Sequence, residues 1–376
     1  MVESIHRPSK VKVNLSAITY NIEQEMIRRH EGQEIYAVVK ANGYGHGAIE
    51  VAKTAIQAGA TGLCVSNLDE ALELRHAGIL APILVLSHIS ADYFTLALEQ
   101  HITLTIPSIE WLEELGQYLE HHPDKKAVTH LKVDSGMGRI GLRTVEEFDR
   151  CSDLIKEHPN LILEGIFTHF ATADSTSQNH FEEQQQRFVK ALEHLPTDVK
   201  YIHTANSATA LWHDAWESNL IRFGDAMYGM NPSGHELTLP YEIKQALSLE
   251  TELIHVKEIE SGEKIGYGAS YESNGQEWIG TLPIGYADGL LRRFQGYHVI
   301  IEGIKVPIVG RVCMDQCMVR LPRRFDPGTK VTIFGENNGA FNSVQSGADY
   351  IGTINYEVTC ALSSRLARTY VYDGDK

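Results

Sequence analysis

Lys40 is the residue whose setting most clearly suggests chemistry. It ends an apolar run, EIYAVVK (34–40), and a glycine-rich segment, ANGYGHG, follows it. At the end of a buried strand an ammonium is partly desolvated, which lowers its pKa and leaves a nucleophilic amine suited to Schiff-base formation. The same residues also fit a lysine that reaches solvent beside an Asn-Gly turn, so the local sequence leaves both interpretations open.

Other polar groups follow the ends of other apolar runs. They are Lys132, Arg139, His169, Asn206, Ser207, Arg222 and Gly224. This set contains no pair of carboxylates, which argues against a glycosidase, because that chemistry usually needs two acids. The cationic and polar character of the set favours a bound anionic cofactor.

The elements that must position these groups are short apolar runs rich in Val, Ile and Leu, separated by helical patterns. One helix is expected after a cap at Ser16, and another between the cap pair Asn67 and Glu70 and a stop at Gly78. Strands and helices in alternation predict an α/β fold, a (β/α)₈ TIM barrel over residues 11–240, whose functional groups gather at the C-terminal ends of the strands. The runs span 34–40, 61–67, 82–88, 102–106, 128–134, 161–169, 199–205 and 220–226.

Residues 241–376 have a different sequence pattern, in which predicted strands dominate. VIIEGIKVPIVGRVCMDQCMVRLP predicts strands joined by a tight turn at Glu302-Gly303, and KVTIFGE and TINYEVTCALSSRLARTYV are expected to add further strands. We therefore expect a mainly β C-terminal domain, with which residues 1–10 could pack.

Composition narrows the class of protein and its partners. The net charge of −16 disfavours nucleic acid and anionic membranes as partners. No apolar run is long enough to span a membrane, and the N-terminus lacks a secretory pattern. Five scattered cysteines indicate reduced thiols, so we expect a soluble, cytoplasmic protein. Cys313 and Cys317 would share a strand face around Asp315, but no second pair of ligands is near, and no metal is expected.

Eight segments, in the same order along nearly the whole chain, resemble those of the alanine racemases, which use pyridoxal phosphate. They are AVVKANGYGHG, HLKVDSGMGRIG, GIFTHFATAD, HTANSA, IRFGDAMYG, IGYGASY, GRVCMDQ and TINYEV. The resemblance implies the barrel-plus-β architecture and interconversion of L-alanine and D-alanine, which supplies D-alanine for peptidoglycan.

The resemblance also implies two catalytic residues. Lys40 would bind the cofactor covalently and move a proton on one face of the substrate Cα, and Tyr267 would serve the other face of a planar carbanion. Two groups are needed because one base tends to return the proton to the side it came from. In the family each site borrows Tyr267, Met314 and Asp315 from the partner in a head-to-tail homodimer, with Met314 at the substrate.

Further roles are implied for the cationic residues. Arg222 would face the pyridine nitrogen, and because arginine stays protonated it would donate a hydrogen bond but no proton. Arg139 would reach the phenolic oxygen of the cofactor and the substrate carboxylate. Lys132 is carbamylated in many relatives, which would make it an anionic partner for Arg139. His169 would pack near Arg222 and help to fix it.

The remaining implied residues bind phosphate or line the approach to the site. Phosphate would be held by Tyr44, Ser207, Tyr356 and the amides of Gly224 and Asp225, with Asn206 also at the cofactor. Four residues, with Asp315 behind them, would restrict the site to a small side chain. They are Asp174, Tyr286, Arg292 and Arg311.

Two residues depart from the family pattern, and three other functions compete. Asp225 replaces a branched apolar residue and would place a carboxylate beside the phosphate unless it points away, and Ala367 replaces a proline without expected harm.

Broad-specificity or serine-preferring racemases remain open, as does a pyridoxal-phosphate decarboxylase, which would be expected to carry an acid where Arg222 stands. GMGRIG (136–141), with Glu164 downstream, resembles a dinucleotide motif, but Glu164 lies inside its predicted strand.

Overall fold

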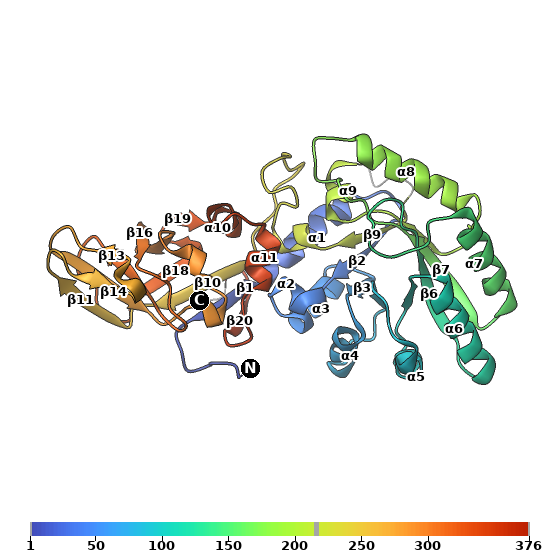
Figure 1. Cartoon of the computed structure of the whole chain (residues 1–376), viewed down its shortest axis with the longest axis horizontal. Helices are drawn as coiled ribbons and strands as arrows, with labels where there is room; N and C mark the ends of the chain where they lie inside the picture. The colour runs from blue at the N-terminus through green and yellow to red at the C-terminus, as the bar shows by residue number, and fades with distance from the viewer. Residues whose placement is uncertain (1, 214–217, 375–376) are drawn as a thin grey trace.

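The computed structural model describes residues 2–213 and 218–374, so the last two residues of the expected β domain lie outside it. Figure 1 shows two parts side by side along the long axis of the molecule. One part is a ring of strands surrounded by helices, and the other is dominated by a twisted sheet. This arrangement confirms the predicted α/β fold, a barrel followed by a mainly β region.

The barrel strands all run parallel and follow one another in chain order within the described residues. A bridge from Leu84 to Thr103 joins the two halves on one side, and the amide of Arg222 donates to the carbonyl of Ala205 on the other. Seven of the predicted apolar runs contain one of these strands, and β6 begins one residue before its run. The strands are β2 (Glu34–Val38), β3 (Gly62–Val65), β4 (Ile83–Val85), β5 (Leu104–Ile106), β6 (Ala127–Lys132), β7 (Leu161–Phe167), β8 (Tyr201–His203) and β9 (Leu220–Phe223).

Amphipathic helices cover the outside of the barrel and bury their apolar faces against the strands. The first helix begins at the residue after Asn14, and the side chain of Asn14 caps it by accepting a hydrogen bond from the amide of Ala17. The cap expected at Ser16 is therefore wrong. The hydroxyl of Ser16 instead accepts from the amide of Asp373. The helices are α1 (Leu15–Arg28), α3 (Ala48–Gln57), α4 (Leu68–His76), α5 (Phe94–Glu99), α6 (Ile109–His121), α7 (Val145–Glu157), α8 (Asn179–Leu192) and α9 (Ser207–Trp212).

The β region is built on one long sheet in the order β11-β14-β17-β16-β15-β18-β10-β1-β20, with β19 beside β18. Its first strand, β1 (Lys10–Asn14), pairs antiparallel with β10 and parallel with β20. The boundary expected at residue 11 therefore falls inside a strand that belongs to this sheet. The other strands are β10 (Leu247–Glu252), β11 (His255–Ile259), β14 (Glu277–Leu282), β15 (His298–Ile301), β16 (Ile304–Val309), β17 (Cys317–Leu321), β18 (Lys330–Asn337), β19 (Ala340–Asn342) and β20 (Ala367–Val371).

The predicted turn at Glu302-Gly303 joins β15 to β16, and both turn residues have the positive φ that such a tight hairpin needs. The strand expected at TINYEV is wrong, because this segment forms α11 (Asn355–Cys360), preceded by α10 (Val344–Ile351). α11 packs on the segment after Lys40, and a Cβ added at Gly45 would lie 2.1 Å from the carbonyl oxygen of Thr359. Tertiary packing thus overrides the strand preference of these residues.

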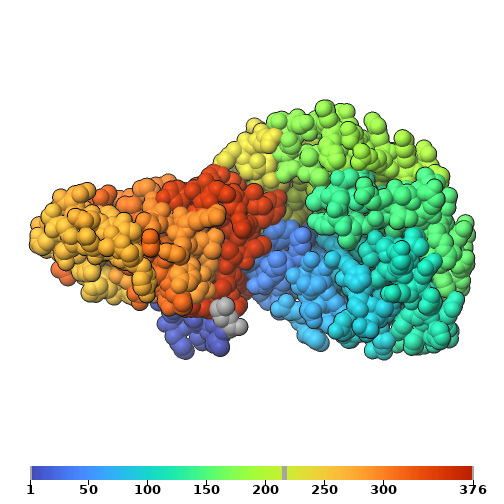
Figure 2. Space-filling model, viewed as in Figure 1, coloured from blue at the N-terminus to red at the C-terminus, as the bar shows by residue number. Residues whose placement is uncertain are grey.

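The space-filling view in Figure 2 shows the β region narrowing away from the broad barrel. A small two-stranded sheet, β12 (Lys264–Ile265) and β13 (Tyr271–Glu272), lies in this region. In the part of the chain that the structure describes, no helix has the length and apolar character that crossing a membrane requires.

Candidate active site

Lys40 follows β2 at the barrel mouth and opens a short turn, α2 (Lys40–Tyr44), in which Ala41, Asn42 and Tyr44 adopt left-handed φ values of 51–53°. A non-glycine residue in this conformation costs about 1–2 kcal/mol, so neighbouring contacts must maintain the turn. The carboxylate of Glu70 accepts from the amides of Ala41 and Ser66 at 2.8 and 2.7 Å. Burial, followed by the charge of Arg139, lowers the pKa of Lys40, as the apolar run predicted.

Arg222 lies in β9 and is buried inside the barrel mouth. Its guanidinium donates to Nδ1 of His203 at 2.8 Å and to the carbonyl oxygens of Thr168, His203 and Thr204 at 2.8–3.2 Å. Burial lowers the pKa of Arg222 to about 10, which still leaves the guanidinium charged at neutral pH. The hydrogen bond from Arg222 to a histidine goes to His203, and His169, which the sequence analysis expected near Arg222, lies close enough for the charge of Arg222 to lower its pKa.

Lys132 and Arg139 extend the cationic cluster. Lys132 is buried, donates to the carbonyl of Val133 at 2.9 Å, and has its pKa lowered to about 7 by burial and then by the charge of Arg222. Arg139 is exposed in the loop after β6. Burial and the charges of Arg222, Lys132, Arg139 and Lys40 hold the pKa of His169 well below its usual range. Four cations therefore converge on one neutral imidazole, an arrangement suited to an anion.

A group of hydroxyls and amides forms a second part of the mouth. Ser207 Oγ accepts from the amide of Gly224 at 2.9 Å, and a Cβ at Gly224 would lie only 2.9 Å from the hydroxyl of Tyr44. The ring of Tyr44 lies 6.1 Å from that of Tyr356, which comes from α11. Only glycine at position 224 leaves the space beside the Tyr44 hydroxyl open, so the cradle fits the phosphate of a cofactor.

Asp225 and Asn206 border this cradle. Asp225 is buried, neither carboxyl oxygen makes a hydrogen bond, and burial raises its pKa well above the usual range, which favours the neutral acid. Tyr356 is the neighbour that opposes this shift of the pKa. The side chain of Asn206 caps α9 by accepting from the amide and hydroxyl of Thr209 at 2.8 and 2.9 Å.

Tyr267 lies between β12 and β13 and is 71% exposed. Together with Met314, which is 53% exposed, and Asp315, it lines an open hollow of about 550 Å³. In Figure 1 the adjoining strand β13 lies far from α2 along the long axis. One chain therefore does not bring Tyr267, Met314 and Asp315 to its own barrel mouth.

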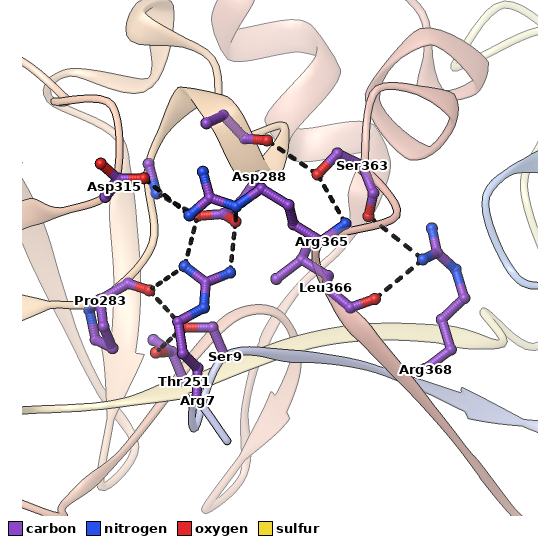
Figure 3. Close-up of polar contacts among 12 residues, drawn as sticks. Arg7, Ser9, Thr251, Pro283, Asp288, Asp315, Ser363, Arg365, Leu366 and Arg368 are labelled. Atoms are coloured by element: carbon purple, nitrogen blue, oxygen red, sulfur yellow. Dashed lines mark hydrogen bonds and ion pairs between the residues drawn. The ribbon is translucent and has the colours of Figure 1, made fainter. Parts of the chain in front are cut away.

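The residues expected along the approach to the site are divided between the two parts. Asp174 follows β7 at the barrel mouth, and burial raises its pKa. Tyr286, Arg292 and Arg311 lie in the β region with partly or fully exposed side chains. The carboxylate of Asp315 accepts a hydrogen bond from Arg365 at 2.8 Å (Figure 3).

The structure corrects the expectation for the two cysteines and shows where two other segments lie. Cys313 lies in the loop before β17 and Cys317 begins that strand, so the two do not share a strand face. In GMGRIG, Gly136 and Gly138 donate to the carboxylate of Asp134 at 3.1 and 2.9 Å, an internal loop contact rather than a dinucleotide turn. Ala367 begins β20 opposite Lys10.

Three residues that the sequence analysis did not select complete the interior of the mouth. The ring of Phe167 stacks on His203 with centroids 4.7 Å apart and lies between the cations of Lys132 and Arg222, at 5.3 and 5.4 Å. His130 lies behind His203. For the two histidines, the sequence did offer a signal, which is a polar residue within an apolar run, as in VTHLKVD and VKYIHTA.

Comparison with known proteins finds relatives over nearly the whole chain. The alanine racemase N-terminal domain model matches residues 13–232, and the C-terminal domain model matches residues 246–370. An alanine racemase of Ligilactobacillus salivarius is 48% identical over 98% of this chain and all of its own length.

Solved structures of alanine racemases are also similar to this chain over nearly its whole length. The crystal structure of alanine racemase from E. faecalis has a TM-score of 0.97 at 48% identity and covers 99% of this chain and 100% of its own. The alanine racemase from Bartonella henselae, solved with covalently bound pyridoxal phosphate, has a TM-score of 0.87 at 26% identity and covers 97% and 99%. This chain belongs to the alanine racemase family.

Proposed function

We propose that this protein interconverts L-alanine and D-alanine with pyridoxal phosphate as its cofactor. The observation that carries the proposal is the barrel mouth, where Lys40 lies among cations beside a cradle of hydroxyls and amides. The bound cofactor supplies an electron-withdrawing ring system that stabilises negative charge at the substrate Cα. The full-length match to alanine racemases, one of which binds this cofactor covalently, supports the assignment.

Lys40 would bind the cofactor and carry a proton on one face of Cα, because its lowered pKa makes the neutral amine available. Tyr267 would carry the proton on the opposite face. Arg222 would donate to the ring nitrogen without protonating it, which limits electron withdrawal and favours return of the proton to Cα over transamination. An acid at this position would favour the decarboxylase alternative; arginine does not.

The phosphate would be bound by the hydroxyls of Tyr44, Ser207 and Tyr356 and by the amides of Gly224 and Asp225, with Asn206 fixing the turn that carries Ser207. Arg139 would bind the phenolic oxygen and the substrate carboxylate. Lys132, with a pKa of about 7, would hold enough neutral amine to react with carbon dioxide. The resulting carbamate, formed with release of one proton, would place an anion beside Arg139, and His169 would remain neutral near Arg222.

A head-to-tail homodimer would complete each site. Tyr267 and Met314 are exposed in a single chain, whereas the mechanism requires a proton carrier opposite Lys40. A second copy that inserts these residues would also bring Tyr286, Arg292, Arg311 and Asp315 to the approach, where Asp174 lies. Such a narrow channel would favour a methyl side chain over larger ones.

We further propose that the protein acts in the cytoplasm and supplies D-alanine for peptidoglycan. The five thiols are free, as a reducing compartment would keep them. Neither nucleic acid nor membrane is an expected partner of a chain with a net charge of −16.

The decisive test is to incubate the cofactor-loaded protein separately with each L-amino acid and to measure the D-form by chiral chromatography. We expect D-alanine to form fastest, with equal amounts of both enantiomers at equilibrium. Faster turnover of L-serine would favour the serine-preferring alternative, and similar rates for several substrates would indicate broad specificity. Release of carbon dioxide without D-product would instead identify a decarboxylase.

A further inference from the structure

Arg222 is a buried cation without an adjacent acid. It is 4% exposed, and among the residues that the structure describes no carboxylate lies within ion-pair distance of its guanidinium. A buried charge is costly unless neighbouring groups compensate for it. Its compensation therefore has to come from hydrogen bonds, and one of these bonds begins a chain that leads through the barrel interior.

The direction of that chain follows from the chemistry of arginine. A guanidinium only donates, so Nδ1 of His203, 2.8 Å from Arg222, must accept and the imidazole proton must lie on Nε2. Nε2 of His203 lies 2.8 Å from Nδ1 of His130, which must accept in turn. The proton of His130 is thereby placed on its Nε2, which donates to Glu164 at 3.2 Å.

The backbone is shaped to make these contacts. Between β6 and β7 the register shifts, so that Thr129 pairs with Leu163 but His130 pairs with Gly165. Glu164 is the extra residue of this bulge, a device that re-aims a side chain. A Cβ at Gly165 would lie 2.7 Å from Nδ1 of His130, so only glycine leaves room for the imidazole.

The surroundings keep both imidazoles neutral and the acid ionised. His130 and His203 are fully buried, and burial is the largest cause of the lowered pKa of each. The hydrogen bond from His130 lowers the pKa of Glu164, whose side chain remains partly exposed. The chain thus joins a buried guanidinium to an ionised carboxylate through two neutral rings.

We propose that Glu164 is a positioning residue for Arg222, acting through His130 and His203 as the acceptor end of the chain, which together with the donor end at Arg222 fixes the proton on each imidazole. Reversal of the chain would put an N–H of His203 against the N–H of Arg222 and displace the guanidinium. The inference depends on the proposed function only in taking Arg222 as the residue that faces the cofactor.

The test compares two variants of the full-length, cofactor-loaded protein by long-range ¹H–¹⁵N NMR of its histidines. Glu164→Gln retains an oxygen acceptor, so both imidazoles should keep their protons on Nε2. Glu164→Leu has a similar size but no acceptor, so His130 and His203 should show mixed tautomers. A proton on Nδ1 of either histidine in the unmodified protein, or unchanged tautomers in Glu164→Leu, would overturn the proposal.

A kinetic measurement separates positioning from simple destabilisation. The bond lost is made to an ionised carboxylate, and loss of such a charge-assisted bond corresponds to a change of about tenfold or more, so Glu164→Leu should raise the ratio of transamination to racemisation at least about tenfold, and Glu164→Gln should leave the ratio near that of the unmodified protein. Ile162→Ala, on the exposed side of the same strand, controls for weakening of β7 and should not alter the ratio. An equal ratio in Glu164→Leu and Ile162→Ala would refute the positioning role.

The two proposals can fail separately. A protein that does not racemise alanine but shows the Nε2–H pattern would contradict the proposed function and leave the hydrogen-bond chain intact. Racemisation with the opposite tautomers would contradict this inference alone.

Discussion

At the scale of single residues, burial decides the charge state of the groups at the barrel mouth. Lys40 and Lys132 have lowered pKa values because each ammonium is partly or fully removed from water. Arg222 is also buried, yet it stays charged because the intrinsic pKa of a guanidinium is so high. One fixed cation and two lysines that can lose their protons give the site an anion-binding group and neutral amines together.

Asp225 is the residue at which this chain departs most clearly from the family pattern. An ionised carboxylate beside a phosphate would oppose binding by charge repulsion. Because burial raises the pKa of Asp225, it favours the neutral acid and so weakens this repulsion. The sign reverses with pH: phosphate binding should weaken as the pH rises through the pKa of this carboxyl.

We predict that Asp225→Asn, which cannot ionise, binds pyridoxal phosphate within about twofold of the unmodified protein at neutral pH, a free-energy difference below about 0.5 kcal/mol. The variant should lose less affinity than the unmodified protein as the pH rises. Fluorescence titration at several pH values measures this, with pyridoxal, which lacks the phosphate, as control ligand. Parallel pH profiles for the two proteins would contradict the prediction.

At the scale of elements, the N-terminal segment before β1 braces the loops that carry Tyr286 and Asp315. Arg7 donates to both oxygens of Asp288 at 2.5 and 3.2 Å, and Arg365 links Asp288 to Asp315 (Figure 3). Asp288 is fully buried and also accepts from the amide of Gly285. Two arginines from opposite ends of the chain therefore converge on one carboxylate.

We predict that Arg7→Ala lowers the free energy of unfolding by about 3 kcal/mol, because it leaves the buried carboxylate of Asp288 with a weaker charged partner. Arg323→Ala is the matched control, since it removes an ion pair with Glu302 that is exposed and worth less than about 1 kcal/mol. Urea unfolding measures both. Equal losses in the two variants would show that burial does not strengthen the contact.

At the scale of the whole molecule, the two halves of the chemistry lie in different parts of the chain. Lys40 lies at the barrel mouth, and Tyr267 lies in the narrow β region, exposed to solvent. Tyr267 and Met314 line one hollow together, and grouped exposed apolar side chains often mark a contact surface. A second copy of the chain is the partner that the proposed mechanism requires.

Hybrid dimers test this arrangement. Lys40→Ala and Tyr267→Phe should each be inactive alone, but a hybrid of the two contains one site with both natural residues. Random re-association gives half hybrids with one working site of two, so mixing should restore about a quarter of full activity. Continued inactivity after verified subunit exchange would exclude shared sites.

The control carries both changes on one chain. A hybrid of Lys40→Ala/Tyr267→Phe with the unmodified chain has one change in each site and should be inactive. Mixing these two proteins in equal amounts should therefore halve the starting activity, whereas independent sites would leave it unchanged. Racemase assays after unfolding and refolding together provide both measurements.

The sequence alone determined the alternation of buried strands and helices, because Val, Ile and Leu recur with the spacing that a doubly covered strand requires. It also singled out Lys40 at the end of such a run, but it left open whether the ammonium is desolvated or reaches solvent, which only the burial seen in the structure decides. It could not indicate α11, in which packing against the turn after Lys40 overrides local strand preference.

Only the tertiary structure decided which groups touch. Glu70 reads locally as a helix cap, yet its carboxylate holds the amides of Ala41 and Ser66. Arg222 donates a hydrogen bond to His203, which the sequence did not single out, and the bulge at Glu164 extends the chain of hydrogen bonds to a second strand. These contacts join residues far apart in the chain, so their geometry depends on strand register and barrel closure, which local sequence preferences do not encode.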